Sequence, residues 1–142
     1  MPKIVYKATP KQFYDSICKT GLDPQKGGQI GGATSMSMAV RTPTKYDKGY
    51  TWLGPYSQAL AYAQDKFVNR DPIILKVTIP DVIDGNMIKI KDRGTGGFTT
   101  KQLITPQYIE VQVEKGDFFT NIAAKPEPYI ITEDDQDFTD EW

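Results

Sequence analysis

The stretch from Ser57 to Pro80, SQALAYAQDKFVNRDPIILKVTIP, contains the clearest helix and the clearest strand of the chain. Its first part, 57–67, carries an apolar stripe at helical spacing, formed by Ala59, Leu60, Ala63 and Phe67. In its second part, 72–80, apolar residues alternate with Lys76 and Thr78, which predicts a strand with one buried face. The two parts together predict a domain of mixed strands and helices.

Upstream, the sequence predicts a short strand followed by a helix. The segment Lys3–Lys7, KIVYK, is typical of a first strand. Thr9 and Pro10 then suit the N-cap and the first position of a helix over residues 10–20. Gly21 follows this helix and is suited to end it, because glycine tolerates the left-handed conformation that commonly follows a helix.

Further strands are expected at residues 50–53, before the stretch 57–80, and at 85–90, 108–113 and 118–122 after it, with a turn at 114–117. Two segments rich in glycine and polar residues, 23–48 and 91–105, are expected to be loops. The first loop contains four glycines, but their spacing does not fit a phosphate-binding motif, which favours a flexible loop. A flexible loop is the simpler interpretation of the second segment too.

The composition predicts one domain over residues 1–131, followed by an acidic tail over 132–142. A solvated tail is the simpler interpretation, and Phe138 and Trp142 keep a partner-binding tail open. A net charge of −1 argues against a broad electrostatic nucleic-acid binder, although a small basic site for one RNA loop is compatible with it. The first ten residues lack a secretory core and no apolar run could span a membrane. We therefore expect cytoplasmic synthesis without a membrane partner, compatible with delivery into a target cell.

The chain contains no histidine and a single cysteine, Cys18. This excludes Ser-His-Asp and Cys-His nucleophiles, histidine-containing zinc sites and internal disulfides, so no metal is expected. Cys18 lies in an apolar helical pattern and is predicted to be a small buried hydrophobe. Carboxylate, lysine, tyrosine, hydroxyl and backbone groups remain. Cleavage of an N-glycosidic bond suits this set, because a carboxylate stabilises the oxocarbenium-like transition state.

The order of the elements resembles that of the mono-ADP-ribosyltransferase toxins, which cleave NAD at its nicotinamide–ribose bond. Five segments carry the resemblance, at residues 5–9, 13–24, 49–63, 72–88 and 105–119. The resemblance implies an α+β fold of two packed, mostly antiparallel sheets with peripheral helices. It also implies that NAD is consumed as a substrate.

The resemblance implies that Glu110 is the catalytic carboxylate, which stabilises the oxocarbenium ion. Two positions earlier the family has Gln or Glu, whereas this chain has Tyr108, and the adjacent Gln107 could shift in through a bulge. The departure favours NAD hydrolysis or a non-protein acceptor. A second register, with Gln112 and Glu114 at the motif, is less favoured because Glu114 opens a turn. Without a catalytic role, Glu110 would be a solvent-facing strand carboxylate.

The resemblance also implies where NAD and the target would bind. Lys7 stands at the position of the family's phosphate-binding arginine, which keeps the charge but loses the bidentate fork. Arg41, in the long loop, could replace that arginine, and Tyr50 and Trp52 would pack the nicotinamide. The residues predicted to bind NAD are Tyr6, Lys7, Arg41, Tyr50, Thr51 and Trp52. Those predicted to recognise the target, in the second loop, are Phe98, Thr99, Thr100 and Gln102.

The function implied is that of a monomeric bacterial or phage toxin or effector. It would transfer ADP-ribose to a protein or nucleic-acid target, or hydrolyse NAD, and a cognate immunity protein is an expected partner. Two alternatives stay open at this point. One is a histidine-free ribonuclease toxin that uses Lys, Tyr and Glu on a small sheet. The other is a non-catalytic binding or inhibitor module, which the departures at Lys7 and Trp52 support.

Overall fold

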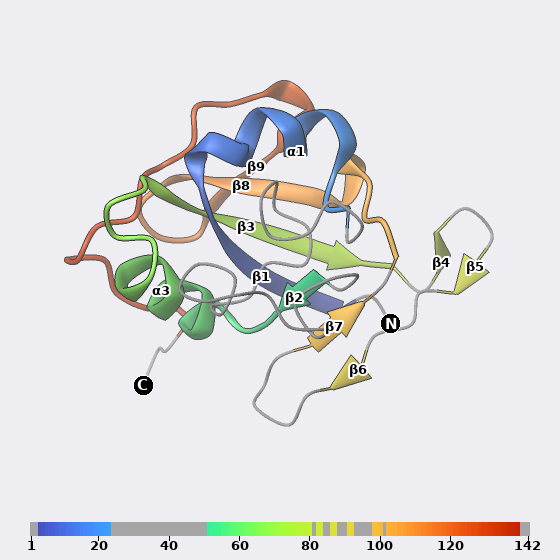
Figure 1. The fold of residues 1–142 in the computed structure, drawn as a ribbon, viewed down its shortest axis with the longest axis horizontal. Helices are drawn as coiled ribbons and strands as arrows, with labels where there is room; N and C mark the ends of the chain where they lie inside the picture. Colours follow the sequence, from blue (N-terminus) through green and yellow to red (C-terminus); the bar gives the residue numbers. More distant parts are fainter. Residues whose placement is uncertain are drawn as a thin grey trace.

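The computed structural model describes residues 3–23, 51–80, 82–83, 86–87, 91–92, 98–100 and 102–139, and it has a mixed α+β architecture (Figure 1). The strands are β1 (Lys3–Pro10), β2 (Thr51–Leu53), β3 (Pro72–Ile79), β4 (Val82–Ile83), β5 (Asn86–Met87), β6 (Lys91–Asp92), β7 (Phe98–Thr100), β8 (Ile109–Glu114) and β9 (Phe118–Asn121). The helices are α1 (Tyr14–Thr20) and α3 (Tyr56–Asp65), with 3₁₀ turns η1 (Lys11–Phe13), η3 (Pro106–Tyr108) and η4 (Ile122–Ala124).

A four-stranded antiparallel sheet in the order β1-β3-β8-β9 forms the centre of the fold. The strand predicted at 72–80 is confirmed as β3, which pairs with β1 from Lys3 opposite Ile79 to Pro10 opposite Pro72. The predicted helix start at Thr9 and Pro10 is therefore wrong. Both residues complete β1, because pairing with the long apolar β3 outweighs the local capping signal. The α-helix begins only at Tyr14.

A second, three-stranded sheet has the order β2-β7-β6. The predicted loop at 91–105 is wrong in part, because it supplies β6 and β7, and β7 pairs with β2. Of the strand predicted at 85–90, the structure describes residues 86–87, which are strand as predicted and pair antiparallel with β4, and the other residues of this range lie outside the described ones. The two main sheets join where Tyr6 and Gly54 exchange backbone hydrogen bonds of 2.7 and 3.0 Å.

The predicted end of the first helix is confirmed at Gly21. This glycine has a φ of 82°, and its N–H donates to the carbonyl of Ile17 at 2.8 Å. Leu22 then forms a backbone bridge with Ile104, with hydrogen bonds of 2.9 and 3.0 Å. The bridge anchors the chain that leaves α1 to the segment that leads into β8.

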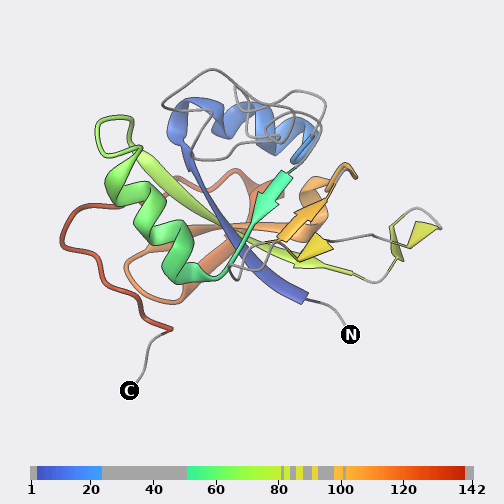
Figure 2. The ribbon, with the colours of Figure 1, turned by 60° about the horizontal axis from the view of Figure 1, so that its bottom comes forward.

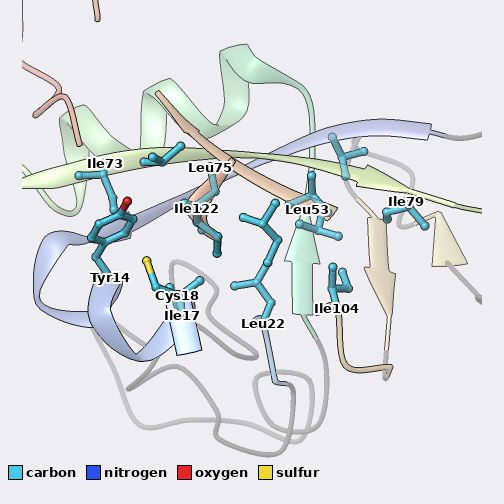
Figure 3. Packing of buried hydrophobic residues seen from close by; sticks show 14 residues of the cluster. Tyr14, Ile17, Cys18, Leu22, Leu53, Ile73, Leu75, Ile79, Ile104 and Ile122 are labelled. Carbon is cyan, nitrogen blue, oxygen red and sulfur yellow. The ribbon is translucent and has the colours of Figure 1, made fainter. Parts of the chain in front are cut away.

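The two helices lie on opposite faces of the four-stranded sheet (Figure 2). On one face, α1 packs Ile17 and Cys18 against Leu75 and its neighbours (Figure 3). Cys18 is buried as predicted, and burial is the main cause that raises the pKa of its thiol. On the other face, α3 buries its predicted stripe, and Phe67 is buried just beyond the helix end.

The segment after β9 returns along the sheet rather than leaving it. The N–H of Tyr129 donates to the carbonyl of Gln112 at 2.8 Å, and that of Ile131 donates to Pro72 at 2.8 Å. The sequence favoured a fully solvated acidic tail, but Asp135 within it is buried. None of the helices in the described part of the chain combines the length and apolar character needed to cross a bilayer.

Candidate active site

Three polar side chains form a row across the face of the sheet that also carries α3. Tyr6 of β1 lies directly opposite Lys76 of β3, which lies directly opposite Glu110 of β8. Side chains paired in this way lie on the same face, a few ångströms apart. Gln112 and Phe119 are paired across β8 and β9 on the same face. We call the surface formed by Tyr6, Lys76, Glu110, Gln112 and Phe119 the Glu110 face.

The alternation of β8 explains why Glu110 points to this surface. Its neighbours in the strand, Ile109 and Val111, are fully buried in the core beneath α1, so Glu110 must point the other way. Glu110 is half-buried. Among the described residues no side chain forms a hydrogen bond or an ion pair with its carboxylate. The carboxylate is therefore held at the sheet surface and left available.

The charges around Tyr6 are predominantly negative. Burial is the largest cause that raises the pKa of its hydroxyl, and the carboxylates of Asp117, Glu110 and Asp137 raise it further. The nearby cation is Lys76, whose Nζ lies 5.4 Å from the centre of the Phe119 ring. The surface thus combines carboxylates, one ammonium group and aromatic rings.

Four rings at the edge of this surface form what we call the aromatic cluster: Tyr6, Tyr56, Phe119 and Phe138. Tyr6 meets Tyr56 edge to face, with ring centroids 5.3 Å apart, and meets Phe119 at 5.8 Å. Phe138 lies 4.3 Å from Tyr56 and 6.2 Å from Phe119. These separations are typical of favourable aromatic packing. Tyr56 is buried in the core cluster on this side of the sheet, and the other three rings are partly buried against it.

Gln112 fixes the geometry of the cluster. Its buried amide accepts a hydrogen bond from the hydroxyl of Tyr56 at 3.0 Å and donates one to the carbonyl of Gly116 at 2.8 Å. It therefore ties the start of α3 to the turn between β8 and β9. Burial is the main cause that raises the pKa of Tyr56 to about 12, so its hydroxyl remains a donor at neutral pH.

Lys7, predicted to bind phosphate, lies on the opposite face of the sheet. It pairs with Leu75, which pairs with Val111, and this row faces the core beneath α1. Its side chain is 4% exposed, whereas Glu110 is half-buried on the other surface. The sheet therefore separates Lys7 from Glu110, and the structure does not bring these two predicted residues together. Burial lowers the pKa of Lys7 to about 7.

Burial of Lys7 predicts a pH-dependent stability. The pKa is lower in the folded chain than the usual 10.5, so folding releases a proton between about pH 7 and pH 10.5. Stability should rise with pH through this window, and the cost of burying the charged amine should be complete below it, at about 5 kcal/mol. Lys7→Met should therefore be more stable than the native chain at pH 6, with a difference that shrinks towards pH 10. Urea unfolding at several pH values measures this, and a variant that is less stable at every pH would contradict it.

Tyr108 and Gln107 do not join Glu110 either. Both lie in the 3₁₀ turn η3, where Tyr108 packs against the core beneath α1. Gln107 is exposed, and its carbonyl accepts a hydrogen bond from Asn121 at 3.2 Å. The bulge expected beside Gln107 lies instead between Gln112 and Glu114. In the alternative register, Gln112 is committed to its two hydrogen bonds and Glu114 is exposed at the strand end.

The other predicted residues fall on the second sheet or outside the described chain. The backbones of Thr51 and Trp52 pair with Thr100 and Thr99, so the predicted NAD-binding and target-reading strands are neighbours. The side chain of Thr100 is buried and accepts a hydrogen bond from the N–H of Gln102, which is half-buried. For Phe98, as for Thr51, Trp52 and Thr99, the structure describes the backbone pairing. Tyr50 and Arg41 lie outside the described residues.

Sequence reasoning missed several residues of this surface, chiefly Lys76, Phe119 and Phe138. The alternation in β3 carried a signal for Lys76, because it places this lysine on the less buried face of the strand. Phe119 and Phe138 come from distant segments, and no local pattern links them to Glu110. Within the described ranges, no group of three or more Cys, Asp or Glu side chains is placed to hold a metal ion.

No family model matches the chain, and no curated protein or solved structure shows significant similarity to it.

Proposed function

We propose that this chain is an NAD-cleaving domain of the ADP-ribosyltransferase type, which acts as a transferase or as an NAD glycohydrolase. The observation that carries the proposal is the half-buried carboxylate of Glu110, which shares a sheet face with Tyr6 and Phe119 and forms no hydrogen bond or ion pair that the structure shows among the described residues. Strand adjacency also supports it. The segment that resembles the family's first strand lies beside the one that resembles its Ser-Thr-Ser strand, and the two meet at Tyr6 and Gly54.

The chemistry required fits this surface. The bond between the ribose C1′ and the nicotinamide nitrogen breaks, and its electron pair neutralises the pyridinium ring. Glu110 stabilises the positive charge that develops on the ribose. Water or an acceptor nucleophile then bonds to C1′ and loses a proton to solvent. No imidazole is needed at any step.

The charge distribution suits the nicotinamide end of NAD. The pyridinium ring is a flat cation, and the surface offers it aromatic faces surrounded by Glu110, Asp117 and Asp137. Because Lys7 lies on the other face, Lys76 is the described cation placed to contribute to phosphate binding here.

Incubation of the full chain with NAD, followed by chromatography of the products, tests the proposal. We expect release of nicotinamide. Equal amounts of free ADP-ribose would indicate hydrolysis, and a deficit of ADP-ribose in the presence of protein or nucleic acid would indicate transfer. The absence of nicotinamide release, with and without acceptors, would contradict the proposal.

One observation favours the ribonuclease as a second candidate. Tyr6, Lys76 and Glu110, a set suited to histidine-free RNA cleavage, stand in one row on one sheet face. The carboxylates around Tyr6 weigh against it, since they repel a phosphate backbone. RNA cleavage that needs no NAD, and that Lys76→Ala abolishes, would favour the ribonuclease over the NAD-cleaving enzyme.

A further inference from the structure

The chain places one of its own rings on the aromatic cluster beside Glu110. Phe138 packs against Tyr56 and Phe119, and Tyr6 packs against both of these. We infer that Phe138 is a displaceable stopper, which covers the aromatic surface where the flat cationic ring of the ligand would bind. The inference rests on the proposed function, because it assigns a form of self-inhibition to the same site.

The segment that carries Phe138 is firmly anchored just before it. The buried carboxylate of Asp135 accepts hydrogen bonds from the Tyr129 hydroxyl, at 2.8 and 3.0 Å, and from the Thr132 N–H at 2.7 Å. Gln64 of α3 donates to the carbonyls of Thr132 and Asp135, at 3.0 and 2.8 Å. In Figure 2 this red segment runs beside α3. These hydrogen bonds fix the position of the chain at Thr132 and Asp135, just before Phe138.

Beyond Asp135, the chain is attached to the domain in a different way. In the described residues 136–139, the hydrogen bonds that the structure shows are local, from the N–H and hydroxyl of Thr139 to Asp137. Packing of the Phe138 ring thus holds this stretch on the domain. Residues 136–139, held on the domain by one partly buried ring, can move away without disturbing the sheet.

The surface beneath Phe138 is suited to a different occupant. Asp117, Glu110 and Asp137 all act on the hydroxyl of Tyr6, so the rings lie in a negative environment. A neutral phenyl ring satisfies the aromatic faces, but beside these three carboxylates it leaves Lys76 as the nearby compensating cation. A flat cation would satisfy both, because the faces of aromatic rings and carboxylates attract positive charge. The ligand class that competes with Phe138 is therefore a planar aromatic cation.

Titration of the native full chain and Phe138→Ala with 1-methylnicotinamide, a planar cation, tests the inference by calorimetry. We expect Phe138→Ala to bind the probe at least tenfold more tightly than the native chain, and to gain less affinity for neutral nicotinamide. Phe118→Ala is the matched control, because Phe118 is a 55% exposed ring next to Phe119 in the same strand. Equal affinities of the native and Phe138→Ala chains, or the same gain in Phe118→Ala, would overturn the inference.

A measurement on the native chain keeps the test valid if Phe138→Ala fails to fold. The probe must displace the stopper, so the NMR signals of the Phe138 ring should shift along the same saturation curve as the probe. Signals that stay unchanged at saturation would overturn the inference. Tighter probe binding without any NAD cleavage would support the stopper and remove the proposed function. NAD cleavage with unchanged probe affinity would support the proposed function and overturn the stopper.

Discussion

Gly21→Ala is expected to destabilise the fold by at least about 3 kcal/mol. The φ of Gly21 is 82°, which side-chain-bearing residues rarely adopt, and an added Cβ would lie 2.0 Å from the carbonyl oxygen of Ile104. That oxygen belongs to the backbone bridge with Leu22, so relief of the clash requires the bridge to open. Urea unfolding measures the loss.

Gly116→Ala separates the clash from the backbone strain. Gly116 also has a positive φ, of 94°, but an added Cβ there would meet only the Phe118 ring, at 3.6 Å, an ordinary contact. This control should lose only about 1 kcal/mol, the usual conformational cost. Equal losses in the two variants would show that the close approach of Gly21 to Ile104 does not contribute.

Glu110→Gln is expected to lower the rate of nicotinamide release by about 10²- to 10³-fold, since it removes the charge that stabilises the oxocarbenium ion. The substitution keeps the size of the side chain, and the structure shows no hydrogen bond or ion pair of the carboxylate with the described residues that would be lost. Stability and KM should therefore change little. Steady-state kinetics with NAD separates kcat from KM.

Glu114→Gln is the matched control for charge removal. Glu114 ends the same strand, beyond the bulge that follows Gln112, and is exposed rather than half-buried. It should retain near-native kcat. An equal fall in both variants would mean that general negative charge, not the position of Glu110, supports the reaction.

The parts of the fold that the sequence predicted are those where one strong local pattern decides the structure. The alternation of β3, the stripe of α3 and the stop at Gly21 are examples. The errors arose where pairing across the chain overrules local signals. Thr9 and Pro10 resemble a helix start but extend β1, because β3 offers them partners. Residues 98–100 follow a glycine-rich stretch, and become β7 because β2 lies beside them.

The candidate site could be predicted only in part for a similar reason. Period-two alternation places Lys7 on the side of Val5, and the burial of Val5 beneath α1 takes Lys7 into the core with it. The same alternation places Tyr6 on the face of Glu110. The resemblance suggested Lys7 and Glu110 as site residues but could not show that they lie on opposite faces of the sheet. Phe138 reaches the site only through the turn that Asp135 and Gln64 hold.

The central claim is that the Glu110 face, and not the surface around Lys7, cleaves NAD. The most direct test compares nicotinamide release by three full-length chains: native, Glu110→Gln and Lys7→Met. We expect release by the native chain and by Lys7→Met, and a loss of about 10²-fold or more in Glu110→Gln. Release that survives in Glu110→Gln but disappears in a folded Lys7→Met, or no release by any of the three, would contradict it.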